Sequence, residues 1–148
     1  RKIVRINDRP LMLLVTCSVL FFLFLVFRNT GLYIFWSDEF VYNRLARLIP
    51  LSESSIPSYL FLKLYSFTNY CGDGFLECAR LINSVLFVSA IPFIFFISRR
   101  VASNGVSVII SLLAVFGPIN SVTAYFMPES FYFLSFWVFC WYLLSLEL

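Results

Sequence analysis

Two adjacent carboxylates, Asp38 and Glu39, are the residues of this chain whose types and spacing best fit chemistry. Adjacent carboxylates repel each other unless a cation, a basic group or water compensates them. They can therefore act as a general base or bind a metal only where other polar groups converge on them. A solvated start of a helix, capped by Ser37, is the alternative interpretation of the same pair.

A third acid, Glu129, supplies that convergence. It is the only charged residue between Arg100 and Glu147, and it lies in a short turn between two apolar runs. Taken alone, it is better explained as a turn residue exposed to water. Combined with four basic residues, the three acids predict a mixed-charge site above an apolar bundle; these residues are Arg44, Arg47, Lys63 and Arg80. Such a site suits a ligand with an anionic head and an apolar tail, for example a lipid-linked phosphate.

The composition places the elements that carry these residues in a membrane. Of 148 residues, 61% are hydrophobic, 20% are aromatic and 13% are charged, whereas soluble domains carry about 25% charged residues. The absence of His excludes a Ser-His-Asp triad, an HExxH zinc site and a His proton relay within this sequence. We expect an all-α, polytopic membrane bundle with about four transmembrane helices and no nucleic-acid partner.

Four uncharged runs approach the roughly 20 residues that a helix needs to cross a bilayer core of about 30 Å. They are residues 11–27, 81–98, 106–126 and 130–146. Pro92 predicts a kink in the second run and Pro118 a bend in the third. A secretory signal peptide is the alternative for the first run, but no small-x-small cleavage site follows Phe27, which favours a retained span.

Basic residues predict the orientation, because they favour the cytoplasmic side of a membrane. One cluster (Arg1, Lys2, Arg5 and Arg9) precedes the first run and a pair (Arg99 and Arg100) follows the second. We therefore expect a cytoplasmic N-terminus, an outer loop over residues 28–80, and Glu129 on the outer face. The chain lacks Asn-x-Ser/Thr acceptors, which favours a bacterial inner membrane over the endoplasmic reticulum. Its first and last residues predict a fragment of a longer chain.

The outer loop is expected to hold juxtamembrane amphipathic helices. After Ser37, three apolar residues recur at helical spacing, and two basic residues form a different stripe; they are Val41, Leu45 and Leu48, and Arg44 and Arg47. This pattern predicts a helix in the membrane interface, with its apolar face toward lipid. A second helix, too short to span, is predicted to begin near Pro57.

The four cysteines divide between the loop and the spans. Cys71 and Cys78 lie in the outer loop, and Cys17 and Cys140 lie within predicted spans. In an oxidising compartment the loop pair could form a disulfide. Free thiols are the favoured expectation.

The order of these motifs resembles the N-terminal part of GT-C glycosyltransferases. After the first span come Asp38-Glu39-x-x-Tyr42, then Pro57-Ser58-Tyr59-Leu60 at the start of an apolar helix, then Gly74-Phe-Leu-Glu-Cys-Ala-Arg80-Leu81 at the entry to the second span. The resemblance covers nearly the whole chain. It is greatest to the branch that contains protein O-mannosyltransferases and the aminoarabinose transferases that modify lipid A.

The resemblance implies transfer of a sugar from a polyprenyl-phosphate donor to an acceptor on the outer face, with inversion. Asp38 would be the general base, with Glu39 tuning its pKa, and Glu129 would orient the acceptor or bind a cation. If a metal binds, Asp38 and Glu129 would hold it, and their oxygen ligands favour Mg²⁺ or Mn²⁺. The sugar and the acceptor, whether a glycan, a lipid or a protein, are not specified.

One departure from the family concerns the donor phosphate. Relatives place a basic residue before a Pro pair, where this chain has Ser55-Ile56, and Ser58 replaces the second proline. Contact with the phosphate would then come from the basic residues named above, Arg44 and Arg80 foremost, or from another segment.

Two non-enzymatic alternatives stay open. One is a module that binds a lipid head, such as a segment of a flippase or transporter, and the other is an assembly subunit. Transporters usually keep ionisable groups near the bilayer midplane. Here the charges lie at the ends of the predicted spans, which favours the enzyme.

Overall fold

The computed structural model describes residues 8–32, 37–54 and 58–146, and every regular element within them is helical. The predicted all-α class is confirmed for this part of the chain. The elements, with η denoting a 3-10 helix, are α1 (Asp8–Asn29), α2 (Ser37–Arg47), η1 (Leu51–Glu53), α3 (Tyr59–Tyr65), η2 (Ser66–Gly74), α4 (Phe75–Ser89), α5 (Ile91–Ser98), α6 (Asn104–Phe116), η3 (Pro118–Ala124) and α7 (Glu129–Leu146). Several residues used above lie outside the described ranges, namely Arg1, Lys2, Arg5, Ser55, Ile56, Pro57 and Glu147.

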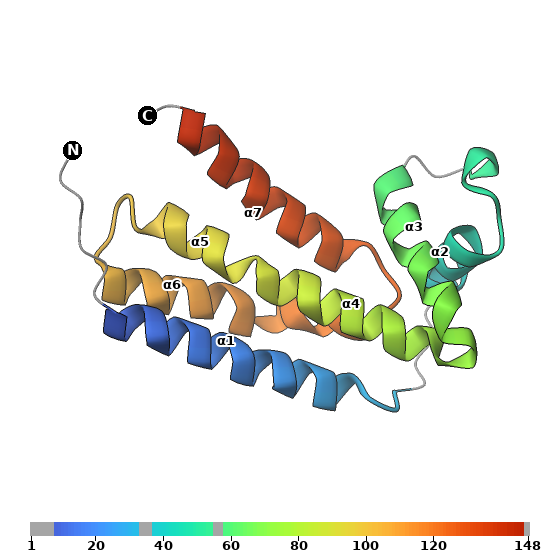
Figure 1. Cartoon of the computed structure of the whole chain (residues 1–148), viewed down its shortest axis with the longest axis horizontal. Helices are drawn as coiled ribbons and strands as arrows, with labels where there is room; N and C mark the ends of the chain where they lie inside the picture. Colours follow the sequence, from blue (N-terminus) through green and yellow to red (C-terminus); the bar gives the residue numbers. More distant parts are fainter. Residues whose placement is uncertain (1–7, 33–36, 55–57, 147–148) are drawn as a thin grey trace.

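The long helices form a bundle. Figure 1 shows α1, α4 with α5, α6 with η3, and α7 running in alternating directions, with α2 and α3 at one end. Within the described residues, three helical stretches are long and apolar enough to cross a membrane, namely Arg9–Asn29, Tyr59–Ser98 and Glu129–Leu146. A fourth crossing is present only if α6 and η3, which meet at a bend of 53°, count as one span.

The bend predicted at Pro118 is confirmed, and the helix is interrupted shortly before Pro92. α4 and α5 are separated at Ala90, two residues before Pro92. Pro92 lacks the N–H group that a continuous helix would direct at the Val88 carbonyl, and the Ala90 N–H donates to the Phe87 carbonyl at 3.3 Å, in the tighter 3-10 pattern. Pro118 begins η3 directly after the bend. Since α6 has only 13 residues, it is about 20 Å long, which is less than a bilayer core.

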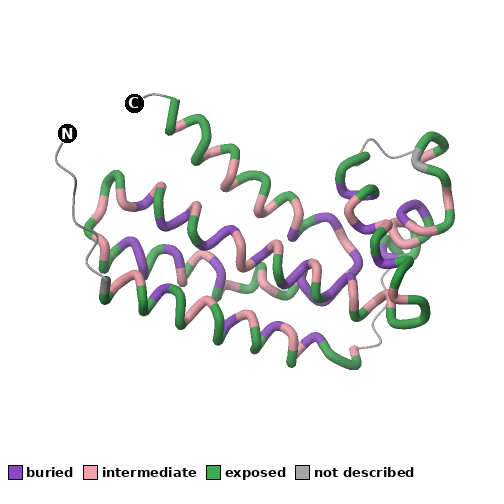
Figure 2. The backbone as a smooth tube through the Cα atoms, viewed as in Figure 1, coloured by how far each residue is buried: buried purple, intermediate pink, exposed green. Residues whose placement is uncertain are grey.

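The outer surface of the bundle is apolar. Figure 2 shows buried residues on the sides of the helices that face one another and exposed residues on the outer sides. Many of the exposed side chains are large and apolar, among them Phe27 at 83% exposure and Phe136 at 58%. Such a surface needs a nonpolar environment, so the arrangement fits a membrane protein.

Polar side chains hold the irregular segment that joins α6 to α7. Its carbonyls lack the regular partners of an α-helix, and an unpaired carbonyl in an apolar environment is costly. Side chains from α1 and α4 donate to three of these carbonyls: Arg28 Nη2 to the Asn120 carbonyl (2.9 Å), Arg80 Nε to the Ala124 carbonyl (3.0 Å), and Asn83 Nδ2 to the Tyr125 carbonyl (2.5 Å). The bend is therefore anchored to two other helices.

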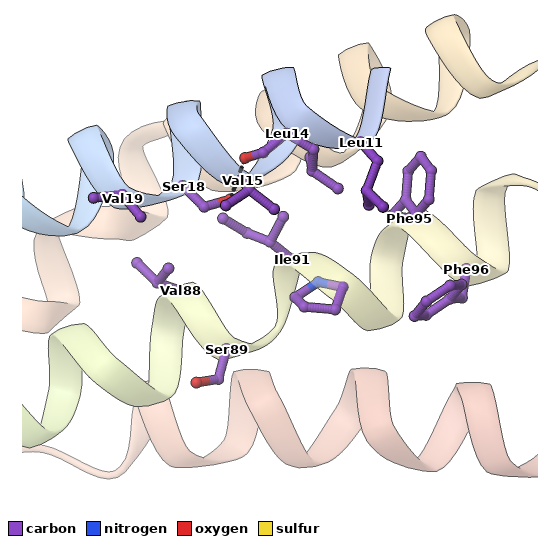
Figure 3. A pocket seen from close by; sticks show the side chains of 11 residues that line it. Leu11, Leu14, Val15, Ser18, Val19, Val88, Ser89, Ile91, Phe95 and Phe96 are labelled. Carbon is purple, nitrogen blue, oxygen red and sulfur yellow. Dashed lines mark hydrogen bonds between the residues drawn. The ribbon is translucent and has the colours of Figure 1, made fainter. Parts of the chain in front are cut away.

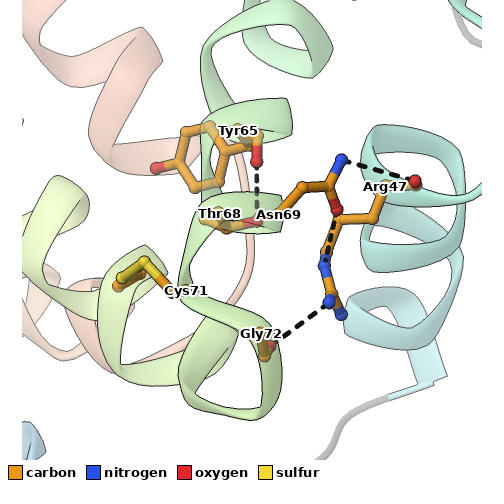
Figure 4. Close-up of a disulfide and its surroundings, with 7 residues drawn as sticks. Arg47, Tyr65, Thr68, Asn69, Cys71 and Gly72 are labelled. Atoms are coloured by element: carbon orange, nitrogen blue, oxygen red, sulfur yellow. Dashed lines mark hydrogen bonds between the residues drawn. A yellow bond between two sulfur atoms is a disulfide. The ribbon is translucent and has the colours of Figure 1, made fainter.

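The segment between α1 and α4 forms a loop unit, which we define as α2, η1, α3 and η2. A disulfide links Cys71 of η2 to Cys78 in the first turn of α4, and the Cα atoms of the two residues are 6.5 Å apart (Figure 4). The expectation of free thiols was wrong for this pair. Gly72 has φ +54°, a conformation that glycine adopts readily, and it lets η2 turn back so that Cys78 faces Cys71.

Arg47, at the end of α2, fastens this helix to the disulfide loop. Its Nε donates to Asn69 Oδ1 (3.1 Å) and its Nη2 to the Gly72 carbonyl (3.5 Å), as Figure 4 shows. The guanidinium also lies 3.8 Å from the centre of the Phe75 ring. These contacts fix the direction of α2 relative to α4.

Only part of the predicted apolar face of α2 is buried. Leu45 is buried in a cluster with Phe61 of α3, but Val41 and Leu48 are 47% and 73% exposed. Glu39 is buried as well. The periodicity located the helix correctly, but it could not show that α3 would cover one side of the stripe only.

We expect the Cys71→Ser/Cys78→Ser variant to unfold more easily, by about 2–3 kcal/mol, because closing a loop of this length restricts the unfolded chain by about that amount. Limited proteolysis of the full chain in detergent at rising temperature measures the change. The Cys17→Ser/Cys140→Ser variant, which removes the two free cysteines, should behave like the unmodified chain. Alkylation of Cys71 and Cys78 without prior reduction would contradict the bond.

Candidate functional site

Glu39 joins α2 to the turn that precedes α7. Its side chain is fully buried, and its Oε1 accepts the Phe126 N–H at 2.6 Å. A hydrogen bond to a carboxylate is shorter and stronger than one between neutral groups. Because Phe126 comes shortly before Glu129, this bond brings the first turn of α7 to the first turn of α2. Glu39 is therefore a positioning residue in this structure.

Asp38 and Glu129 act on the same phenol, that of Tyr42. Partial burial raises the pKa of Tyr42, and the nearby carboxylates of Glu129 and Asp38 and the Tyr132 hydroxyl raise it further. Negative charges disfavour the phenolate, so both acids belong to the electrostatic surroundings of the Tyr42 hydroxyl. We call Asp38, Tyr42, Glu129 and Tyr132 the acid–tyrosine site.

Helical spacing explains how the two pairs form. Tyr42 follows Asp38 at i+4 in α2, and Tyr132 follows Glu129 at i+3 in α7, so each pair shares one face of its helix. Asp38 and Glu129 are both exposed and both lie in a first helical turn. The positive end of the helix dipole favours a carboxylate there. Two accessible carboxylates are thus held beside two phenols.

A cavity of about 360 Å³ opens beside this site, between α3 and α7. Its walls are Ser58, Tyr59, Leu60, Phe61, Phe131 and Tyr132. The Phe61 ring meets the Tyr42 ring edge to face, with centroids 5.5 Å apart, and Ser58 Oγ and the Tyr132 hydroxyl share a hydrogen bond of 2.6 Å across the cavity. The volume is within the range of small-molecule sites. Aromatic faces and hydroxyls therefore lie next to the two carboxylates.

Sequence analysis assigned no role to Tyr42, Tyr132 or Ser58. Spacing from the predicted acids could have identified the two tyrosines, because each lies one helical turn from an acid. No comparable signal was available for Ser58, whose partner Tyr132 is 74 residues away.

Arg80, a predicted phosphate ligand, faces the protein interior. It is 4% exposed, and its Nε donates to the Ala124 carbonyl while its Nη1 pairs with Glu77 Oε1 at 2.9 Å. Its Nη2 donates to the Leu32 carbonyl. Binding a phosphate would require Arg80 to leave these partners, so the geometry gives it a structural task and its phosphate role stays a prediction.

The other three predicted phosphate ligands differ in exposure. At about 3.6 residues per turn, Arg47 lies on the opposite side of α2 from Asp38, where it contacts the disulfide loop. Burial lowers the pKa of Arg47, an effect that the nearby Asp73 partly offsets. Arg44 and Lys63 are exposed, and no hydrogen bond or ion pair engages their charged groups within the described part of the chain. Of the four, these two have the most accessible charge.

The metal prediction concerned Asp38 and Glu129. Among the described residues, no three or more His, Cys, Asp or Glu side chains gather in an arrangement that could hold a metal ion. A Mg²⁺ or Mn²⁺ ion held by Asp38 and Glu129 would therefore have no third His, Cys, Asp or Glu ligand among the described residues.

A second cavity, of about 290 Å³, lies between α1 and the break that separates α4 from α5. Figure 3 shows its walls, which include Leu14, Val15, Ile91 and Phe95. Ser18 also lines it, but its hydroxyl donates to the Leu14 carbonyl at 2.7 Å and is thereby satisfied. The cavity suits an alkyl chain.

We expect Arg80→Gln to lower the free energy of unfolding by at least about 2 kcal/mol, because buried carbonyls lose their donor. The thermal midpoint of the full chain in detergent should fall by several degrees. Lys63→Gln is the matched control and should leave the midpoint unchanged. A wild-type midpoint for Arg80→Gln would contradict the structural assignment.

The pKa of Tyr42 offers a direct test of the convergence. We expect Asp38→Asn and Glu129→Gln each to lower it, whereas Asp73→Asn, which removes an acid elsewhere in the loop unit, should not. Titration of ¹³C-labelled tyrosine by NMR, with Tyr42→Phe to assign the signal, measures the change. Because the folded pKa lies above the unfolded value of about 10, the stability that this group contributes is fully present below pH 10 and is lost as the pH rises through the folded pKa.

Comparisons with known proteins do not assign this chain to a family. No protein-family model matches the chain, and neither a curated protein nor a solved structure is significantly similar to it. The likeness to GT-C glycosyltransferases therefore rests on the order and spacing of the motifs in this sequence.

Proposed function

We propose that this chain is part of a membrane glycosyltransferase that moves a sugar from a polyprenyl-phosphate donor to an acceptor on the outer face. The observation that carries the proposal is the bond from the Phe126 N–H to Glu39. It brings the first turns of α2 and α7, and with them Asp38 and Glu129, to one end of the bundle near an open cavity with aromatic walls.

Asp38 is the general base in this mechanism. Its exposed carboxylate takes the proton from the acceptor hydroxyl, whose oxygen then attacks the anomeric carbon of the donor sugar. The bond from that carbon to the lipid phosphate breaks, the phosphate leaves with the electron pair, and the configuration inverts. Tyr42 and Glu129, which lie near Asp38, can hold the acceptor hydroxyl within hydrogen-bond reach of the base.

The cavity between α3 and α7 is suited to a sugar ring. A sugar presents a C–H face that packs on aromatic rings and an edge of hydroxyls that need polar partners. Tyr59, Phe131 and Tyr132 supply the rings, and the Ser58 and Tyr132 hydroxyls supply polar groups. Both features border the acid–tyrosine site, where the transfer would occur.

The donor's phosphate and lipid tail need different surroundings. Arg44 and Lys63 are the predicted phosphate ligands with exposed charge, and an ammonium or guanidinium stabilises a leaving phosphate. The tail would lie against the apolar surface of the bundle, which includes the cavity of Figure 3.

The same proposal includes an arrangement in the membrane. The four spans would be α1, α4 with α5, α6 with η3, and α7, with the N-terminus in the cytoplasm of a bacterium. The loop unit would then be juxtamembrane on the outer side, with the exposed Val41 and Leu48 of α2 toward lipid. In support, the elements alternate in direction (Figure 1), which is the order that four crossings require.

A transporter or flippase segment is the second candidate, because two of the bundle's stretches are broken. Discontinuous helices are common at transporter binding sites. The break between α4 and α5, however, adjoins a cavity lined by apolar residues and two serines, and no charged residue lines it. The enzyme is therefore the better supported of the two.

We expect Asp38→Asn to reduce sugar transfer by at least about 10²-fold, the usual contribution of a general base, while leaving the thermal midpoint unchanged. The assay uses the full-length protein in liposomes with a panel of radiolabelled polyprenyl-phosphate hexoses and pentoses and extracted membrane acceptors.

Asp73→Asn, another exposed acid of the loop unit, is the matched control and should transfer at the wild-type rate. Equal activity of Asp38→Asn and wild type would remove Asp38 as the base. Lipid translocation without any transfer would favour the second candidate.

A further inference from the structure

The end of the bundle opposite the acid–tyrosine site carries an open groove between α1 and α6. Its volume is about 440 Å³, and its walls are Arg9, Pro10, Leu13, Gly105, Val108 and Ile109. One wall residue is cationic and the others carry no charge, so the groove combines a single positive charge with a mostly apolar bed.

We propose that this groove binds an anionic phospholipid, with the phosphate on Arg9 and an acyl chain along Leu13 and Ile109. The proposal is independent of the glycosyltransferase reaction, because the groove lies at the other end of the helices (Figure 1).

The charge of Arg9 is available for a ligand. Arg9 is exposed, and within the described ranges no hydrogen bond, ion pair or aromatic ring engages its guanidinium. The two other arginines at this end have partners: Arg99 lies over the Phe95 ring at 5.5 Å, and Arg100 donates to the Leu144 carbonyl at the end of α7. Among the described arginines at this end, Arg9 therefore differs from Arg99 and Arg100 in having no interaction partner for its guanidinium.

The depth of Arg9 in the bundle matches that of a lipid headgroup. The candidate membrane-spanning helix of α1 begins at Arg9, so the guanidinium lies where the apolar stretch meets water. Below it, Leu13 and Ile109 are 55% and 58% exposed and continue the groove along the apolar stretch. A headgroup on Arg9 would therefore place its acyl chain on these side chains.

Gly105 lines the groove on the side of α6. It lies in the first turn of α6, and a Cβ atom added there would meet nothing within 4 Å. The free amides of this turn also favour an anion, which adds to the effect of Arg9. A large side chain at this position would fill the space between the two helices.

A lipid fits these features better than a second protein does. A helix from another chain would bury the Arg9 guanidinium in an apolar seam, which is costly without a paired acid. A phospholipid keeps this charge at the water interface and covers only the apolar part of the groove.

The test measures binding of phosphatidylglycerol and phosphatidylcholine to the full chain by native mass spectrometry from detergent. We expect the unmodified chain to retain phosphatidylglycerol preferentially, Arg9→Gln to weaken that binding about tenfold or more, and Arg9→Lys to restore most of it. Arg99→Gln, which removes an arginine at the same end of the bundle that does not line the groove, is the matched control and should bind like the unmodified chain.

Gly105 supplies a second, steric test. Gly105→Leu should abolish the preference by filling the groove, whereas Gly105→Ala, which adds only a Cβ atom in open space, should keep it. Unchanged phosphatidylglycerol binding in both Arg9→Gln and Gly105→Leu would overturn the proposal. A loss of self-association in these variants with lipid binding intact would also overturn it, because the groove would then be an interface between copies. If Gly105→Leu does not fold, the comparison of Arg9→Gln with Arg9→Lys decides.

Discussion

The arrangement of this protein depends on satisfying the backbone of one irregular segment inside an apolar bundle. The stretch from Gly117 to Phe126 cannot pair its own groups as an α-helix would, and lipid offers no hydrogen bonds in return. Arg28 and Arg80 donate to its carbonyls, and Glu39 accepts one of its amides. These side chains come from α1, α4 and α2, so one segment ties three helices together at a single end of the bundle.

This constraint separates the tasks of two adjacent acids. Successive residues of a helix point about 100° apart, so Glu39 can face inward to the Phe126 amide while Asp38 stays exposed. The Phe126 N–H is one partner of the buried Glu39 carboxylate. This bond also holds α7 so that Glu129 arrives near Tyr42. The exposed acids are thus placed by a buried one.

Much of the fold could be predicted because it follows from local chemistry. Uncharged runs of sufficient length become helices, and Pro92 and Pro118 interrupt them whatever the surroundings are. The partners of polar side chains depend on packing across the chain and leave no periodic signal. Arg80 was therefore interpreted as a phosphate ligand although it donates to two carbonyls, and the cavity between α3 and α7 was not foreseen. The disulfide was undervalued for the same reason, since it depends on the turn at Gly72.

The scarcity of charge in this chain makes the uncommitted charges informative. Several charged side chains are occupied in the fold: Arg28, Arg80 and Glu39 support the irregular segment, and Arg47 fastens the loop unit. A charged side chain that is exposed at the end of the bundle and has no structural partner adds no packing to the fold. The exposed acids Asp38 and Glu129 gather around one phenol beside a cavity, and in the same loop unit Arg44 keeps an exposed charge. The division between occupied and accessible charge therefore leaves a few charged groups, Asp38, Glu129 and Arg44 among them, exposed at one end of the bundle, because the fold already engages the others.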